Sequence, residues 1–210
     1  MTYTLYNRLG SGGFAVEAAL VYAAADHRLE LVESAPSTPM PEHFRAINPW
    51  NQVPALVTQD GTLITETGAI LIWLAGRHPA LGPEPFSDDH GAFVRWIVFL
   101  SVNIYEGVLR QTYPERFGSE ETAKIVGRAA RDRNQQAYEL IEAALEGRET
   151  LVGDTISAAD IYVAMLTAWH RDLSALPRVE ALAERVAGHP AIAPIWQKNF
   201  DHRLDRKWGR

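Results

Sequence analysis

The sequence contains no cysteine among its 210 residues. This absence excludes disulfide bonds, thiolate metal sites and a cysteine nucleophile supplied by the protein. An excess of basic charge is also missing, because 20 Lys and Arg stand against 26 Asp and Glu and give a net charge of −6. We therefore expect no nucleic-acid partner and no attraction to an anionic membrane. The seven His do not show the HxxxH or HExxH spacings of metal sites, so we predict no bound metal.

Long hydrophobic runs are missing as well. No apolar stretch reaches the ~18 residues that a membrane-spanning helix needs. The stretch 13–25 resembles a signal peptide, because it follows Arg8 and ends in three alanines. However, Glu17 interrupts it, and its small and apolar residues recur at helical spacing. We interpret it as the amphipathic first helix of a cytoplasmic protein that has no membrane partner.

The first 78 residues mix strand and helix patterns. Alternating or apolar stretches predict strands, the Asp60-Gly61 pair predicts a hairpin, and apolar residues at helical spacing predict helices. In chain order, we expect strand 2–7, helix 14–25, strand 29–33, a helical turn at 41–47, strands 55–58 and 62–65, and helix 67–77. The predicted order is therefore β-α-β-α-β-β-α.

The chain from residue 90 onward shows helical patterns throughout. Helices are predicted over 90–109, 120–145, 160–169, 176–187 and 191–199. The third of these is apolar nearly all round, so it should be buried. A stretch rich in Pro and Gly precedes them and predicts a linker. We therefore predict an α/β domain over residues 1–78, a linker over 79–89 and an all-helical domain over 90–210.

A glycine-rich turn separates the first strand from the first helix. Gly10, Gly12 and Ala15 match the G-x-G-x-x-G/A pattern of dinucleotide-binding sites, and Glu30 follows twenty residues later. A dinucleotide-binding sheet would continue with right-handed β-α-β units, whereas a hairpin and then only helices are predicted here. We therefore favour a turn whose free backbone amides begin a helix and suit an anion or a thiolate.

Three further motifs each allow a structural interpretation. Pro54 stands directly before an apolar strand, and spacing alone favours a trans proline there. Thr65 or Thr67 suits the N-cap of the helix that follows. Ser157 and Asp160 have the spacing of a capping box ahead of an apolar run, so we predict that they serve folding rather than chemistry.

Taken together, these motifs resemble the soluble glutathione transferases of bacterial type. The resemblance is carried by NPxxQVPAL at 48–56, the Asp-Gly hairpin, TETGAILIWLA at 65–75, the Pro/Gly linker and the SAAD box at 157–160. It covers nearly the whole chain and implies a thioredoxin-like first domain followed by an all-α second domain. It also implies glutathione as co-substrate and usually a homodimer. Finally, it implies a cis bond before Pro54, which replaces the trans interpretation from spacing.

The resemblance further implies a glutathione site in the first domain, built around a cis Pro54. The backbone of Val53 would pair with the cysteinyl part of glutathione, as an added β-strand does. Thr67 at a helix start would hold the γ-glutamyl carboxylate, and Glu66 would pair with the ammonium. Gln52 would donate to the glycyl end. A basic partner for the glycyl carboxylate is not evident, since the first 80 residues contain no Lys and three Arg.

The catalytic position departs from the family pattern. Members of the family place Tyr, Ser or Cys at the end of the first strand or in the following loop, and this chain has no Cys. We predict Ser11 as the thiol activator, with Tyr6 at the strand end as the runner-up. A third alternative is that the backbone amides at 12–14 activate the thiol. Asn103 and Tyr105, on the first helix after the linker, are predicted to line the electrophile site.

The predicted function is activation of the glutathione thiolate for attack on a small, mostly apolar electrophile, by conjugation or isomerisation. A free thiol has a pKa near ~8.5, which a helix N-terminus can lower. The alternatives are glutathione-dependent reduction of disulfides or peroxides, and a non-catalytic relative that carries a ligand or assembles. A homodimer is expected, because the first helix after the linker carries the surplus aromatics Phe99 and Tyr105. The basic tail 198–210 should be solvated, and Trp208 suggests that it folds back on the body.

Overall fold

A computed structural model describes residues 2–33 and 40–204 of the chain. Its first region is built from β1 (Tyr3–Asn7), α1 (Gly13–Tyr22), β2 (His27–Leu31), α2 (Glu42–Ile47), β3 (Ala55–Val57), β4 (Leu63–Thr65) and α3 (Thr67–Ala75). The predicted β-α-β-α-β-β-α order is confirmed. The prediction about Trp208 concerns a residue outside the described part of the chain.

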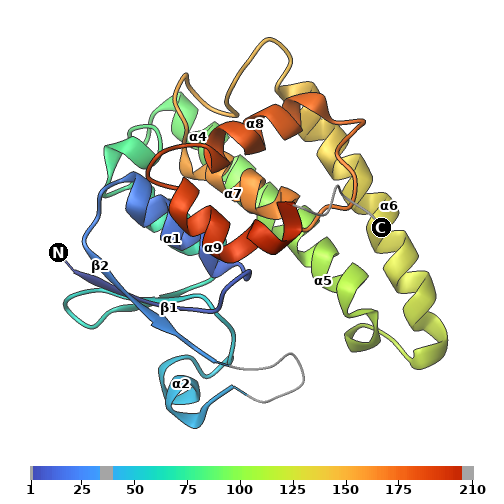
Figure 1. The fold of residues 1–210 in the computed structure, drawn as a ribbon, viewed down its shortest axis with the longest axis horizontal. Helices are drawn as coiled ribbons and strands as arrows, with labels where there is room; N and C mark the ends of the chain where they lie inside the picture. The colour runs from blue at the N-terminus through green and yellow to red at the C-terminus, as the bar shows by residue number, and fades with distance from the viewer. Residues whose placement is uncertain (1, 34–39, 205–210) are drawn as a thin grey trace.

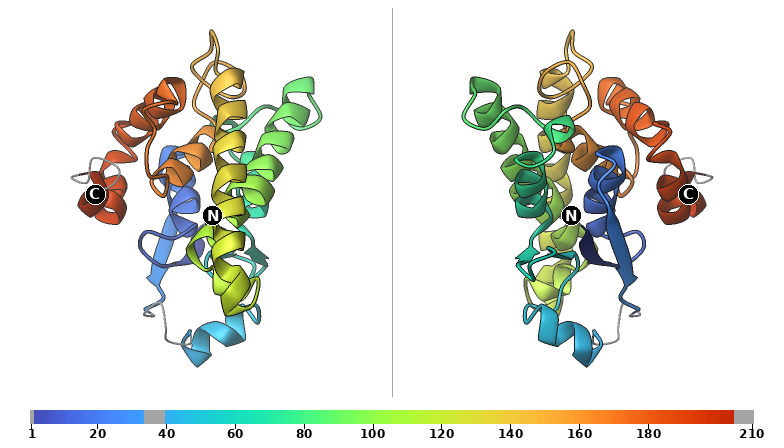
Figure 2. Two further views of the ribbon diagram at one scale, coloured as in Figure 1. Left: turned by 90° about the vertical axis from the view of Figure 1, so that its right-hand side faces the viewer. Right: turned by 90° about the vertical axis from the view of Figure 1, so that its left-hand side faces the viewer.

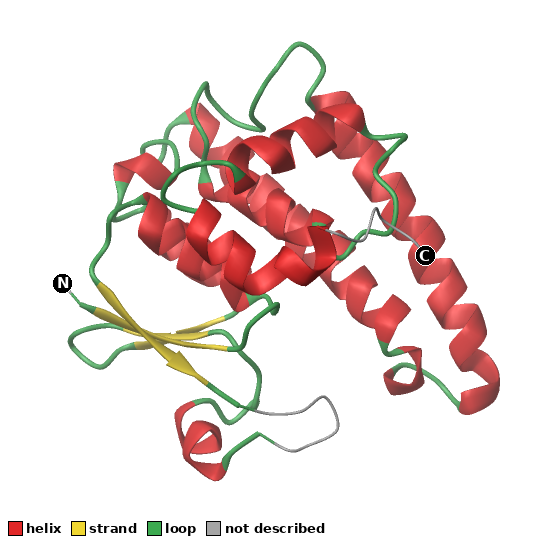
Figure 3. Ribbon diagram, viewed as in Figure 1, coloured by secondary structure: helices red, strands yellow, loops and turns green. Residues whose placement is uncertain are grey.

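The four strands form one sheet in the order β2-β1-β3-β4 (Figure 3). β1 pairs in parallel with β2, whereas β3 runs antiparallel to both β1 and β4. The hairpin between β3 and β4 turns at Gly61, whose φ of 84° lies in the left-handed region that glycine tolerates. The described sheet therefore contains a single parallel pair of strands, and not the extended parallel sheet of a dinucleotide-binding domain.

The two faces of the sheet are covered differently. Because side chains alternate along a strand, Leu5 of β1 points to the face that α1 and α3 cover. Its neighbour Tyr6 points to the opposite face and packs near Phe44 of α2, with Val32 and Ala55 in the same cluster. In Figures 1 and 2, α2 accordingly lies across the sheet from the other helices.

The secondary structure elements of the second region are all helices among its described residues. After a 3₁₀ turn at Pro79–Leu81 come α4 (Asp88–Phe99), a π-helix (Leu100–Tyr105), α5 (Glu106–Thr112), a second 3₁₀ turn (Pro114–Arg116), α6 (Glu120–Ala144), α7 (Ala158–Thr167), α8 (Pro177–Ala187) and α9 (Ala193–Leu204). The single helix expected over 90–109 is therefore three consecutive helical segments. The domain limits at 78, 79–89 and 90 stay a prediction, although α4 begins at Asp88, inside the expected linker.

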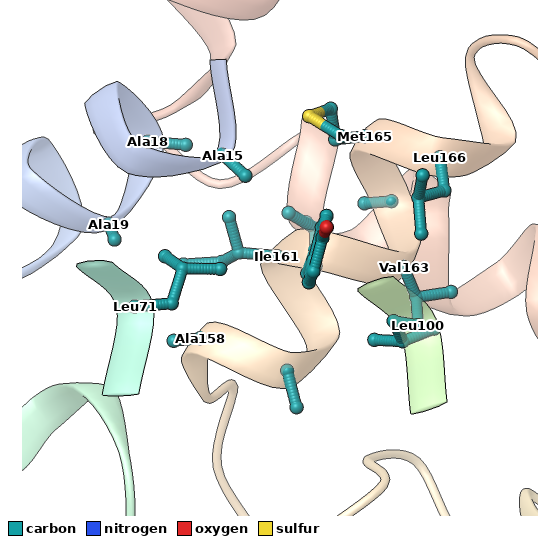
Figure 4. Close-up of a cluster of buried hydrophobic side chains, with 14 of the residues drawn as sticks. Ala15, Ala18, Ala19, Leu71, Leu100, Ala158, Ile161, Val163, Met165 and Leu166 are labelled. Carbon is teal, nitrogen blue, oxygen red and sulfur yellow. The ribbon is translucent and has the colours of Figure 1, made fainter. Parts of the chain in front are cut away.

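Helix α7 lies at the centre of the molecule, and all of its residues are buried. Figure 4 shows Ile161 of α7 facing Leu71 of α3, with the small side chains of Ala15 and Ala19 of α1 nearby. The small alanine side chains of α1 leave room for α1 and α7 to approach each other closely. The sheet region and the helical region therefore share one continuous apolar core.

The start of α7 has the predicted capping box. The Asp160 carboxylate accepts hydrogen bonds from the Ser157 backbone N–H at 2.8 Å, the Ser157 hydroxyl at 2.7 Å and the Leu151 N–H at 2.8 Å. Asp160 is fully buried, and these three donors offset only part of the loss of water, because burial still raises the pKa of its carboxyl above the ordinary value. These hydrogen bonds stabilise the start of α7.

The C-terminal helix α9 ties the second region back to the first. Trp196 and Phe200 pack edge-on against Phe14 of α1, with ring centroids 5.3 and 4.8 Å away. The buried Asn199 side chain accepts a hydrogen bond of 2.9 Å from the Gly10 N–H. This contact fixes the glycine-rich turn that leads into α1.

Candidate active site

A cavity of about 330 Å³ opens between the sheet region and the helical region. The first region contributes residues next to cis-Pro54 and at the starts of α1 and α3. The second region contributes side chains from the π-helix, α5 and the 3₁₀ turn that follows α5. The predicted residues Ser11, Gln52, Val53, Pro54, Glu66, Thr67 and Tyr105 all line this cavity. The fold therefore brings together residues up to 94 positions apart in the sequence.

The start of α3 presents open backbone amides to the cavity. Thr67 is the first residue of α3 and is buried, and its hydroxyl donates to the Gly12 carbonyl at 3.3 Å. Within the described part of the chain, no group accepts a hydrogen bond from the backbone N–H of Thr67 or Gly68. Such amides and the helix dipole favour a bound anion.

Glu66 precedes this helix in an unusual backbone conformation. Its φ of 68° lies in the left-handed region, which non-glycine residues rarely adopt. The side chain is exposed and lines the cavity next to the open amides of Thr67. A carboxylate held here can pair with an ammonium group whose own carboxylate sits on the helix start.

The Val53-Pro54 peptide bond is cis, as the resemblance implied. No described residue hydrogen-bonds to the backbone N–H or carbonyl of Val53, so both groups are open to a ligand strand. The buried Asn48 side chain braces this turn by donating to the Gln52 carbonyl at 2.7 Å and accepting from the Trp50 N–H at 3.1 Å.

The start of α1 is occupied by its own chain. The Ser11 hydroxyl donates to Asn7 Oδ1 at 2.9 Å and accepts from the Gly13 N–H at 3.3 Å. The Phe14 N–H donates to the Ser11 carbonyl at 3.1 Å. Two of the three amides proposed as the third activator alternative, those of Gly13 and Phe14, therefore already have partners.

Tyr105 reaches the start of α1 from the second region. A Cβ atom added to Gly12 would lie 2.3 Å from the Tyr105 hydroxyl and 3.0 Å from Thr67 Oγ1. The Tyr105 ring is stacked on Trp169 with a centroid distance of 5.3 Å and an interplanar angle of 17°. Burial, together with the nearby Glu66 carboxylate, raises the pKa of Tyr105 to about 12. The phenol therefore keeps its proton at neutral pH and can donate a hydrogen bond to an anion.

The π-helix aims Tyr105 at this position, and Asn134 of α6 supports the π-helix. With its amide oriented to satisfy both ends, Asn134 Nδ2 donates to the Asn103 carbonyl at 2.9 Å and Oδ1 accepts from the Val108 N–H at 3.1 Å. A Cβ atom on Gly107 would clash with the side-chain amide group of Asn134, so the contact requires glycine there. Asn134 thus satisfies backbone groups where the helical hydrogen-bond pattern changes.

Two predicted site residues do not line the cavity. Tyr6 packs on Phe44 across the sheet, with ring centroids 6.0 Å apart. The Asn103 side chain donates to the Phe99 carbonyl of its own helix at 3.2 Å. Their proposed roles remain predictions, but neither side chain is placed to contact a ligand in this cavity.

Sequence reasoning gave no role to the two arginines of the cavity. Arg8 was noted without a role, and Arg116 was not considered. Arg8 directly follows β1, and Arg116 closes the 3₁₀ turn after α5. Neither position belongs to a periodic pattern, so no sequence signal pointed to Arg116. Elsewhere in the described residues, no group of three His, Asp or Glu side chains is arranged to hold a metal ion.

Comparison with known proteins supports the same interpretation. The model of the glutathione S-transferase N-terminal domain matches residues 15–77, and that of the C-terminal domain matches residues 98–192. Glutathione S-transferase GST-4.5 of Xanthomonas campestris is 30% identical over 195 residues, which cover 87% of this chain and 91% of that protein. Ser11 lies before the first matched residue, so the family match itself does not assign its role.

Solved structures extend the similarity to the fold. A sphingomonad glutathione S-transferase complexed with glutathione superposes with a TM-score of 0.81 at 26% identity, covering 93% of this chain and 98% of that one. A glutathione transferase from Methylococcus capsulatus gives a TM-score of 0.82 at 28% identity, covering 94% of this chain and 98% of that one. The thioredoxin-like first domain and the all-helical second domain are therefore confirmed. The chain belongs to the glutathione S-transferase family.

Proposed function

We propose that this protein is a glutathione transferase that activates the glutathione thiol for attack on a small electrophile. The observation that carries the proposal is the open start of α3 beside Glu66, in one cavity with Val53, Ser11 and Tyr105. The chemistry of these groups fits glutathione, which has two carboxylates, one ammonium and one thiol. Glu66 pairs with the ammonium, the Thr67 amide binds the γ-glutamyl carboxylate, and Val53 pairs with the cysteinyl backbone.

The thiol then lies near the start of α1. We propose Ser11 as the side chain that donates to the sulfur, which requires its proton to turn away from Asn7. Tyr105 offers a second hydroxyl from the opposite wall, and its raised pKa makes it a donor and not a base. A hydrogen bond to the thiolate favours the charged form and lowers the pKa of the thiol. In conjugation, sulfur bonds to the electrophilic carbon, the leaving group departs with its electron pair, and the thiol proton passes to solvent.

The test is turnover with a simple electrophile in parallel with ligand binding. Calorimetry should show glutathione binding, and 1-chloro-2,4-dinitrobenzene should be converted to its glutathione thioether with release of chloride. Binding without turnover across a panel of electrophiles would favour a non-catalytic carrier. Reduction of hydroxyethyl disulfide or cumene hydroperoxide without conjugation would favour the reductase alternative. Absence of glutathione binding would reject all three.

We also propose a homodimer formed through the outer face of α4 and the π-helix. Tyr105 no longer supports this proposal, because it faces α1 and Trp169. Instead, Val98 and Val102 are 49% and 63% exposed on that face. Contrary to the expectation from the sequence, α4, the π-helix and α5 together form one continuous helical stretch, Asp88–Thr112, that is long and apolar enough to cross a membrane, the one such stretch among the described residues; 28% of its most apolar part is buried. A second copy would cover such a surface.

Light scattering tests the homodimer. The wild type should give about twice 23.4 kDa at micromolar concentration, and Val102→Glu should shift it towards the monomer mass. Ile125→Glu is the matched control, because Ile125 is 69% exposed on α6. A monomeric wild type would reject the dimer. The cytoplasmic location expected from the sequence stays a proposal.

A further inference from the structure

A second cavity, of about 250 Å³, lies where α5 and α6, side by side in Figure 1, meet the chain that follows α7. Among the described residues it shares no lining residue with the first cavity. The stacked rings of Tyr105 and Trp169 connect the two, since Tyr105 lines the first cavity and Trp169 the second. We propose that the second cavity is a separate binding site for a small carboxylic acid with one aromatic ring. The proposal does not depend on the proposed transferase function.

The wall of the second cavity contains a buried tyrosine whose hydroxyl has no partner. Tyr138 of α6 lines the cavity and is 1% exposed, and within the described part of the chain its hydroxyl forms no hydrogen bond. Buried hydroxyl groups are nearly always paired, because an unpaired one loses its water without compensation. Burial raises the pKa of Tyr138, so the phenol keeps its proton and can donate it to an acceptor. An oxygen atom of a ligand would supply the acceptor.

His170 adds a second donor beside Tyr138. It also lines the second cavity, and its ring meets the Tyr138 ring edge to face, with centroids 4.6 Å apart. The His170 Nδ1 atom accepts a hydrogen bond from the Asp172 backbone N–H at 3.2 Å, and burial lowers the pKa of the ring, so the ring is neutral at pH 7. A neutral imidazole whose Nδ1 accepts carries its proton on Nε2. The phenol and the imidazole are therefore both donors, as the two oxygens of a carboxylate require.

The charged side chains of the second cavity are mainly basic. Arg131 of α6 and Arg171 line it, and Asp172 is the one acidic residue among its described lining residues. Neither guanidinium forms an ion pair with a described carboxylate, whereas Asp172 already accepts a hydrogen bond of 2.9 Å from the Ser174 N–H. All three charged side chains are exposed, so they act at the rim. The rim therefore favours an anion, and a guanidinium can hold a carboxylate by two parallel hydrogen bonds.

The remaining walls set the size and the shape of the ligand. Trp169 contributes an indole ring, and Val108 and Ala175 contribute aliphatic surface. An aromatic ring of a ligand gains more from contact with an indole than from water. Because an apolar cavity of ~150 Å³ can hold benzene, the second cavity, at about 250 Å³, has room for one ring and a carboxylate. A bare anion would leave the apolar walls without a partner.

The experiment compares an acid with its neutral amide while the first cavity is filled. The probes are 4-fluorobenzoate and 4-fluorobenzamide, and their binding is followed by fluorine NMR in the presence of saturating S-hexylglutathione. We expect the acid to bind about tenfold more tightly than the amide, as a hydrogen bond to a charged group provides. Arg131→Gln should reduce this preference. Arg128→Gln is the matched control, because Arg128 lies on the same helix but does not line the cavity, and it should leave both affinities unchanged.

The hydroxyl of Tyr138 is tested by Tyr138→Phe. This variant should weaken binding of 4-fluorobenzoate about tenfold and, without ligand, should melt at or above the wild-type temperature, because the hydroxyl has no partner to lose. Tyr162→Phe is the matched control. Tyr162 is also buried, but its hydroxyl pairs with Ser101 Oγ at 3.3 Å, and it lines neither cavity. Tyr162→Phe should therefore lower the melting temperature and leave the affinity for 4-fluorobenzoate unchanged.

Four results would overturn the second site. They are absence of 4-fluorobenzoate binding, equal affinities for the acid and the amide, unchanged binding of the acid by Tyr138→Phe, and displacement of the acid by S-hexylglutathione, which would place the acid in the first cavity. Failure of S-hexylglutathione itself to bind would count against the proposed transferase function alone. In that case the Tyr138→Phe and Arg131→Gln variants still decide the second site.

Discussion

The two helix starts that meet in the cavity differ in how their backbone amides are used. At the start of α3, the N–H groups of Thr67 and Gly68 have no acceptor in the described part of the chain. At the start of α1, the amides of Gly13 and Phe14 donate to the hydroxyl and carbonyl oxygens of Ser11, and the Tyr105 hydroxyl lies close to Gly12. The start of α3 therefore has amides available for an external anion, whereas amides at the start of α1 already donate to groups of the same chain.

Amides without intrahelical partners are a general property of helix starts and do not by themselves make a binding site. Every α-helix begins with amides that lack intrahelical partners, and a side chain can cap some of them. Helix α7 is capped by the Ser157 and Asp160 pair, and it lies in the core. The uncapped start of α3 faces the cavity, so we expect its amides to bind the carboxylate of the ligand. Activation of the thiol then depends on side-chain hydroxyls near α1 more than on its amides.

The largest effect is expected from removing the charge beside the open start of α3. Glu66→Gln keeps the shape of the side chain but removes the partner of the ligand ammonium. We expect the free energy of glutathione binding to weaken by ~1.5–3 kcal/mol, the range for hydrogen bonds to charged groups. Isothermal calorimetry measures this change, and the melting temperature should stay near the wild-type value.

Glu30→Gln is the matched control for Glu66→Gln. Glu30 lies on β2 in the same region, pairs with Arg28 and does not line the cavity. It should leave glutathione affinity unchanged. If both variants bind glutathione as the wild type does, Glu66 is not the ammonium partner.

The second effect comes from crowding the closed start of α1. In Gly12→Ala, the new methyl group would meet the Tyr105 hydroxyl at 2.3 Å, although the φ of −59° at Gly12 suits alanine. Overpacking of this kind costs ~1–3 kcal/mol of unfolding free energy, and the shifted Tyr105 should also lower turnover. Chemical denaturation and steady-state kinetics measure the two losses.

A double variant shows whether Tyr105 causes the loss. Adding Tyr105→Phe removes the closest atom, so part of the stability lost in Gly12→Ala should return. Gly91→Ala on α4 is the control, because nothing lies within 4 Å of the added Cβ. Strict additivity of Gly12→Ala and Tyr105→Phe would mean that the two residues do not interact.

The third effect distinguishes the two hydroxyls near α1. Ser11→Ala should raise the pKa of the bound glutathione thiol and lower turnover at neutral pH about tenfold. This is less than the ~10²–10³ typical of an oxyanion donor, because Ser11 also serves Asn7 and Gly13. The measurement is thiolate absorbance against pH. An unshifted titration in Ser11→Ala together with a shifted one in Tyr105→Phe would transfer the role to Tyr105.

The same contrast explains which parts of the site could be predicted from sequence. Glu66 and Thr67 are adjacent in the chain and come directly at the start of an apolar helix. The ligand-binding start of α3 could therefore be predicted from neighbouring residues alone. Val53 and Pro54 form a similarly local motif. The order of strands and helices was predictable for the same reason, since each element depends on the pattern of its own segment.

The role of Tyr105 could not be predicted in this way. Its direction depends on a π-helix, whose unpaired backbone groups are satisfied by Asn134 from α6 through the space left at Gly107. It depends also on stacking against Trp169, 64 positions away. No local pattern encodes such contacts, so the sequence suggested only the mouth of the electrophile site. Arg116 was missed for a related reason, because a short 3₁₀ turn has no periodic signature.

The smallest effect concerns the chain of contacts behind Ser11. Asn7 accepts from Ser11 and, through Nδ2, donates to Glu17 of α1 at 3.5 Å. Glu17 is 4% exposed, and burial raises the pKa of its carboxyl above the ordinary 4.5. Because the folded-state pKa is the higher one, Glu17 favours folding when protonated, below its unfolded pKa, and this contribution is lost as pH rises through the folded pKa. At pH 7 the buried charge therefore opposes folding.

Glu17→Gln should raise the melting temperature at pH 7 by about 2 °C, a shift expected of a sub-kilocalorie change in a chain of this size. The gain should shrink as pH falls below 4.5, where the wild-type carboxyl is protonated in both states. Glu184→Gln, an exposed position on α8, is the control and should show no pH-dependent gain. If Glu17→Gln lowers the melting temperature at pH 7, the ionised carboxylate stabilises the closed start of α1. Asn7 would then hold Ser11 through that charge, and turnover of Glu17→Gln should fall with its stability.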